Sequence, residues 1–217
     1  MTKTKEITDD KQRKQRKQSC HIQYFMKMVR KSENKQQNKL QQTQACLESG
    51  SASIFNHLNE TAIKHYENAL EMAREQGYQK EETQAYIGLG HAYIFHHQSQ
   101  MAIQQFEKCL EISAEKGFQL QETQAYLGLG VAYRSENQNQ AAIQCYENAL
   151  EIARELQGYK LEETQAHLKL GHAYIWSNQI QMAIQHFEKC LEIAREQGYK
   201  LQQTRAYDGL GEAYRLD

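Results

Sequence analysis

Hydrophobic positions recur along this chain with the spacing of helix faces. After Thr83, the residues Tyr86, Leu89, Gly90 and Tyr93 follow a 3, 4, 7 spacing, which places them on one face of a helix. A polar stretch, HHQSQ, separates them from a second apolar face, formed by Ala102, Phe106, Cys109, Leu110 and Ile112. The pattern therefore predicts two helices joined by a short polar turn, a helical hairpin.

The same hairpin pattern returns along the chain at a nearly constant interval. Its first-helix threonines are spaced by 40, 40, 41 and 40 residues: Thr43, Thr83, Thr123, Thr164 and Thr204. A period of this length indicates stacked supersecondary units. A glycine follows each predicted second helix, where a left-handed cap is expected: Gly77, Gly117, Gly158 and Gly198.

Two further glycine positions recur inside the predicted first helices. One holds Gly50, Gly90, Gly130, Gly171 and Gly211. Glycine in a helix costs about 1 kcal/mol relative to alanine, so we expect two helices to approach closely here. The small residues opposite are Ala62, Ala102, Ala142 and Ala183. The other position holds Gly88, Gly128 and Gly209 but Glu48 and Lys169 in other repeats, so it is predicted to be exposed and unimportant for packing.

These motifs resemble the tetratricopeptide repeat (TPR) family. Three copies carry aromatic-x-x-Leu-Gly-x-x-Tyr followed by Ala-x-x-x-Phe/Tyr-x-x-Ala/Cys: Tyr86, Leu89, Gly90, Tyr93, Ala102, Phe106, Cys109; Tyr126, Leu129, Gly130, Tyr133, Ala142, Tyr146, Ala149; and His167, Leu170, Gly171, Tyr174, Ala183, Phe187, Cys190. The 40-residue unit is similar to the class with Leu-Gly-Asn repeats found in cell-polarity scaffolds. The resemblance implies an all-α fold, a right-handed superhelical solenoid of stacked antiparallel helical hairpins.

The repeat divides the chain into a tail and an array. The expected segments are a basic, disordered tail at 1–20, a degraded half-repeat helix at 21–42, TPR 1 at 43–82, TPR 2 at 83–122, TPR 3 at 123–163, TPR 4 at 164–203, and a terminal half-repeat or capping helix at 204–217.

Charge is distributed unevenly between these parts. Residues 1–40 hold twelve Lys/Arg and four Asp/Glu, a balance of +8, whereas residues 41–217 have a balance of −9. The run KQRKQRKQ at 11–18 has no interleaved aromatic residue for base stacking, so nucleic-acid binding is not the favoured role. Because the two parts have opposite charges, a second hypothesis is that the basic tail contacts the acidic body within the same molecule.

Composition limits the location and the chemistry. The sequence has no apolar run long enough to span a membrane, and its five cysteines form no Cys-x-x-Cys pair, so a reducing, cytoplasmic location is predicted. Adjacent His96 and His97 point about 100 degrees apart on a helix, which does not suit a metal site. Cys109 and Cys190 alternate with alanines, as packed residues do. We expect no enzyme activity, no cofactor and no metal.

The resemblance implies that first helices line a concave, ligand-binding groove. The predicted peptide-binding residues are Gln84, Ile87, His91, Ile94, Phe95, Gln124, Leu127, Arg134, Gln165, Leu168, His172, Ile175 and Trp176. An alternative for Ile87, Leu127 and Leu168, which share one position of the repeat, is that they pack between neighbouring helices. The lysines and asparagines with which some relatives hold acidic chain ends are not found in the groove columns, so such a partner is not expected.

The sequence therefore predicts a non-catalytic protein–protein interaction scaffold or adaptor that binds a peptide or amphipathic helix in its groove. Two alternatives stay open. One is a nucleic-acid-associated protein that acts through the basic N-terminal tail. The other is a fragment of a larger TPR-containing signalling protein.

Overall fold

The computed structural model is built of helices joined by short turns. It describes residues 2–155 and 158–217, and the side chains of Met1–Met26 and Arg30 lie outside this description. The helices in the described ranges are α1 (Thr2–Phe55), α2 (Asn59–Gln76), α3 (Gln79–Phe95), α4 (Ser99–Lys116), α5 (Gln119–Ser135), α6 (Asn139–Glu155), α7 (Lys160–Trp176), α8 (Ile180–Glu196) and α9 (Lys200–Leu216). The all-α prediction is confirmed.

The chain forms two units, Met1–Gln42 and Thr43–Asp217. Residues 2–42 of the first unit belong to α1, so the described part of the segment expected to be a disordered tail and the segment 21–42, expected to be a degraded half-repeat helix, lie in one helix. In the segment 21–42, expected to be a degraded half-repeat, the side chains of Ile22 and Phe25 lie outside the description, and Val29 is exposed. The basic run at 11–18 also lies outside them.

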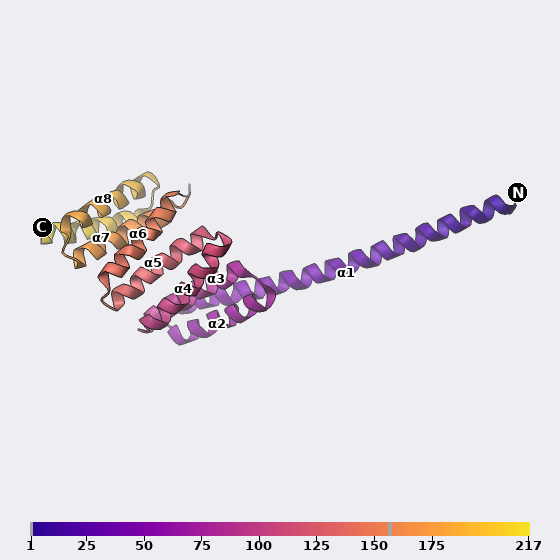
Figure 1. Cartoon of the computed structure of the whole chain (residues 1–217), viewed down its shortest axis with the longest axis horizontal. Helices are drawn as coiled ribbons and strands as arrows, with labels where there is room; N and C mark the ends of the chain where they lie inside the picture. Colours follow the sequence, from indigo (N-terminus) through magenta and orange to yellow (C-terminus); the bar gives the residue numbers. More distant parts are fainter. Residues whose placement is uncertain (1, 156–157) are drawn as a thin grey trace. The chain divides into compact units, whose positions relative to one another are not determined.

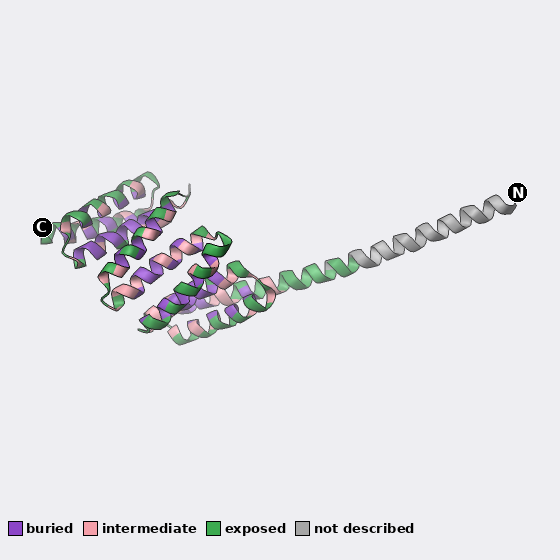
Figure 2. Ribbon diagram, in the orientation of Figure 1, coloured by how far each residue is buried: buried purple, intermediate pink, exposed green. Residues whose placement is uncertain are grey.

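The second unit is a stack of antiparallel hairpins that follow one another in chain order (Figure 1). The C-terminal part of α1 and the helices α3, α5, α7 and α9 are first helices, and α2, α4, α6 and α8 are second helices. The alanine column and the aromatic rings of the second helices are buried between neighbouring helices: Ala62, Ala102, Ala142, Ala183, Tyr66, Phe106, Tyr146 and Phe187. Figure 2 shows this buried layer running along the stack.

The expected close approach at the first glycine column occurs, but against rings rather than against the alanines. A Cβ at Gly90 would lie 2.5 Å from the Phe106 ring of the same hairpin, and one at Gly50 would lie 2.7 Å from the Tyr66 ring. Gly130 and Gly171 face the rings of their own hairpins in the same way. At these four glycines the absent side chain makes room for one aromatic ring, whereas Gly211, in the same column, has no neighbour within 4 Å of its Cβ position.

The prediction for the second glycine column is wrong. Gly88, Gly128 and Gly209 are buried, and a Cβ at any of them would overlap the ring of the preceding hairpin. The Phe106 ring consequently lies between Gly90 of its own hairpin and Gly128 of the next. The repeat pattern did not reveal this packing, because two repeats carry Glu48 and Lys169 at the same position.

Turns between helices use left-handed backbone at two positions per repeat. Gly77, Gly117 and Gly198 have φ of 72°, 70° and 72°, which confirms three of the four predicted left-handed caps, whereas Gly158 has a φ of 121°. The turn from first to second helix also has a left-handed residue, at His57, His97, Asn137 and Asn178, with φ between 56° and 61°. His97 is therefore a turn residue.

Candidate ligand groove

One concave pocket of about 1010 Å³ opens along the first helices of the second unit. Its walls come from α3, α5, α7 and α9. The side chains that line it are Ile87, His91, Ile94, Phe95, Gln124, Leu127, Val131, Arg134, Gln165, Leu168, Lys169, His172, Arg205, Asp208 and Glu212. The repeat thus brings equivalent positions of four helices to one surface.

Most of the predicted groove residues line this pocket. Those that do so are Ile87, His91, Ile94, Phe95, Gln124, Leu127, Arg134, Gln165, Leu168 and His172. Gln84 is exposed and lines a neighbouring pocket of about 310 Å³. Ile175 is buried in the core and Trp176 is 45% exposed at the end of α7, and neither lines the large pocket.

The apolar wall of the groove combines core and surface side chains. Ile87, Leu127 and Leu168 are 6–9% exposed and pack mainly between helices, which is the alternative that the sequence left open for this column. Phe95, at the end of α3, is 54% exposed. The groove therefore has a rigid apolar floor and one accessible aromatic side chain at its edge.

Trp176 contacts two residues that line the groove. Its ring stacks on the His172 ring, with centroids 5.9 Å apart and an interplanar angle of 22°. The Arg134 guanidinium carbon lies 4.4 Å from the Trp176 ring centroid, a cation–π contact between α5 and α7. Arg134 and His172 both line the pocket, so this stack connects Trp176 to the groove wall.

Sequence reasoning missed several charged lining residues. Lys169, Arg205, Asp208 and Glu212 line the pocket together with Arg134. The prediction that the groove columns contain no lysine is wrong, because Lys169 is one of these residues. Lys169 and Arg205 could have been recognised in the sequence, because each differs from the residue that most repeats carry at the same position.

The groove histidines are uncharged at neutral pH. Burial, together with the nearby Lys169 charge, lowers the pKa of His91 to about 4. Burial also lowers the pKa of His172, and Lys169 and Arg134 act in the same direction, although Glu212 opposes them. The positive charge of the groove therefore comes from lysine and arginine.

The described side chains give little indication of a metal site or of a catalytic nucleophile. No group of three or more His, Cys, Asp and Glu within them could hold a metal ion. Burial raises the pKa of Cys109 and Cys145 to about 11 and that of Cys190 to about 12, so these thiols stay protonated at neutral pH and are weak nucleophiles. No helix within the described residues is both long and apolar enough to cross a membrane.

Stacked helical hairpins with a groove along their first helices define a helical-repeat solenoid, the architecture of many binding scaffolds. A model of the tetratricopeptide repeat matches residues 43–115 and 121–196, more than half of the sequence. The chain therefore belongs to the tetratricopeptide repeat family. Proteins of this family are generally protein–protein interaction scaffolds and are typically non-enzymatic. No curated protein sequence matches the chain.

Solved structures share the fold at low sequence identity. RapI in its apo form aligns with a TM-score of 0.65 and 19% identity over 74% of this chain and 58% of RapI, so the chain spans little more than half of that relative. The TPR-like repeats of a kinesin light chain from Podosopora anserina align with a TM-score of 0.65 and 18% identity, over 80% of this chain and 85% of that one. A signal transduction ATPase with a tetratricopeptide repeat sensor from Pyrococcus horikoshii aligns with a TM-score of 0.70 and 20% identity, over 80% of this chain and 26% of that one.

Proposed function

We propose that the protein is a non-catalytic adaptor whose groove binds an amphipathic helix or an extended apolar segment of a partner protein. The observation that carries this proposal is the continuous pocket of about 1010 Å³ along α3, α5, α7 and α9. A groove of this kind accepts a segment that presents apolar side chains at regular spacing.

The edges of the groove support the same role. Phe95 and Trp176 end their first helices with 54% and 45% of their surface exposed. Aromatic side chains dominate the binding energy of many interfaces because they bury a large area with few rotatable bonds. Phe95 would contact a ligand directly, and Trp176 would do so beside Arg134.

The test is capture of partners from a native lysate, followed by mass spectrometry. The groove variant is Ile94→Glu/Phe95→Glu, because both side chains line the pocket. The matched control is Met101→Glu/Met182→Glu, which places the same charges at exposed apolar positions of α4 and α8 outside the pocket lining. Partners retained by the control but lost by the groove variant, at equal helicity, support the proposal. Partners bound equally by all three proteins contradict it.

A further inference from the structure

Three groove positions carry a positive charge where most other repeats carry an uncharged residue. Arg134 on α5 stands where three other repeats have isoleucine. Lys169 on α7 stands where three others have glycine, and Arg205 on α9 stands where four others have glutamine. All three line the same pocket, from three successive first helices.

Lys169 occupies a position that packing would assign to glycine. In the other hairpins the ring of the second helix faces a glycine of the next first helix, as Phe106 faces Gly128. The residue at this position after the Tyr146 hairpin is Lys169. Burial lowers the pKa of the Lys169 ammonium, and the charges of Arg134 and Arg205 lower it further. The Lys169 side chain is nevertheless exposed and lines the groove, so its ammonium group is accessible to a ligand, and an anionic ligand would relieve its repulsion from the two arginines.

The three cations have no carboxylate partner in the described part of the chain. The ion pairs there, with nitrogen and oxygen within 4 Å, involve other residues. The two acidic residues of the groove are on α9, and the carboxylate of Glu212 lies 3.9 Å from His172 Nδ1. Three positive charges thus face an apolar groove in which two carboxylates only partly balance them.

We propose that the groove binds a partner segment with an aspartate or glutamate side chain between apolar side chains, and that Arg134, Lys169 and Arg205 attract its carboxylate. This inference rests on the proposed function of the groove. Guanidinium groups bind carboxylates in a bidentate way, and the contact with Trp176 holds Arg134 in place before a ligand arrives. The apolar walls lower the local dielectric constant and strengthen each charge contact.

The proposal can be tested with a displayed library of random twelve-residue peptides and the full chain. The variant Arg134→Ile/Lys169→Gly/Arg205→Gln replaces each cation with the residue of other repeats, which the same packing already accepts. We expect the wild type to select peptides with Asp or Glu between apolar residues, and the variant to select apolar peptides without that enrichment. For one selected peptide, changing its carboxylate to a carboxamide should weaken binding to the wild type roughly tenfold and leave binding to the variant unchanged.

The outcomes separate this inference from the function on which it rests. Apolar selection by the wild type without acidic enrichment overturns the carboxylate assignment and leaves the apolar groove intact. Peptide selection that Ile94→Glu/Phe95→Glu does not reduce overturns the groove function itself. If the triple variant loses helicity, Arg205→Gln alone serves in its place, since Arg205 is exposed. Unchanged acidic selection by that variant contradicts the proposed role of Arg205.

Discussion

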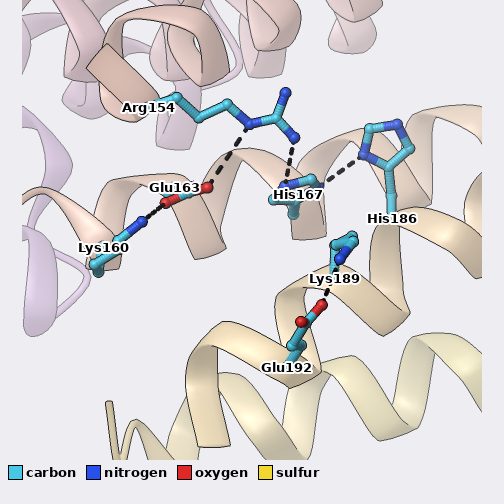
Figure 3. Close-up of polar contacts among 7 residues, drawn as sticks. All are labelled: Arg154, Lys160, Glu163, His167, His186, Lys189 and Glu192. Atoms are coloured by element: carbon cyan, nitrogen blue, oxygen red, sulfur yellow. Dashed lines mark hydrogen bonds and ion pairs between the residues drawn. The ribbon is translucent and has the colours of Figure 1, made fainter. Parts of the chain in front are cut away.

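His167 on α7 and His186 on α8 face each other with their Nδ1 atoms 3.0 Å apart (Figure 3). The Nη2 atom of Arg154 lies 3.3 Å from His167 Nε2, and arginine can only donate. His167 therefore accepts at Nε2 and donates from Nδ1 to His186, whose proton is on Nε2. Adding a proton to either ring breaks one of these hydrogen bonds and places a positive charge near Arg154.

This arrangement predicts that the free energy of unfolding falls as the pH decreases from 7 to 5. Burial, with the neighbouring positive charges, lowers the pKa of His167 to about 3 and that of His186 to about 4. In the unfolded chain both histidines bind protons below about pH 6.5, while the folded protein does not, so acid favours unfolding by up to about 1.4 kcal/mol per pH unit for each histidine. Urea unfolding at several pH values measures this slope.

The control variant for this prediction comes from another repeat. Tyr86 and Gln105 occupy the equivalent positions, and Arg74 donates to the Tyr86 hydroxyl as Arg154 does to His167. The variant His167→Tyr/His186→Gln should therefore fold and show a shallower dependence between pH 7 and 5. Parallel curves for the two proteins would contradict the role of the histidine pair.

Gly128→Ala should destabilise the stack. The added methyl group would overlap the Phe106 ring, which is fully buried and cannot move aside. Overpacking of this kind costs roughly 1–3 kcal/mol. Gly211→Ala is the matched control, because no packed neighbour lies within 4 Å of the place that its Cβ would take, and alanine favours a helix by up to about 1 kcal/mol. Thermal unfolding followed by circular dichroism should show opposite shifts, and equal shifts would refute the ring packing.

His97→Asn should stabilise the protein. His97 has φ of 58°, in the left-handed region, and asparagine occupies the same turn at Asn137 and Asn178. Asparagine adopts this backbone more readily than most residues with a Cβ, so we expect the free energy of unfolding to rise by up to about 1 kcal/mol. His96→Asn is the control, since His96 has φ of −91° and should gain nothing. A gain at both positions, measured by urea unfolding, would argue against a backbone origin.

Trp176 gives the groove an intrinsic fluorescent probe, because it is the one tryptophan of the sequence. Arg134→Ile should increase quenching of Trp176 by acrylamide, since the guanidinium covers one part of the ring at 4.4 Å. Arg205→Gln should leave the quenching unchanged, because no contact between Arg205 and Trp176 occurs among the described aromatic and ion-pair contacts. Equal quenching of the wild type and Arg134→Ile would show that the cation–π contact is absent in solution.

The repeat made most of the fold predictable. A fixed interval with two helical faces per unit has one way to bury those faces, which is to stack the hairpins, and the caps at Gly77 and Gly117 follow from the same pattern. Most groove positions were also predictable, because each repeat presents the same column to the concave side. Ile175 was misplaced since adjacent positions at the end of a helix can face either the core or the groove.

The sequence by itself determined the period, the hairpins and the family, because these depend on local spacing repeated along the chain. The tertiary structure decided which residues of different repeats meet. It buried Gly88, Gly128 and Gly209 against rings of the preceding hairpins, paired His167 with His186, and gathered Arg134, Lys169 and Arg205 in one pocket. Those contacts depend on how successive hairpins pack, and a column of similar residues does not encode that packing.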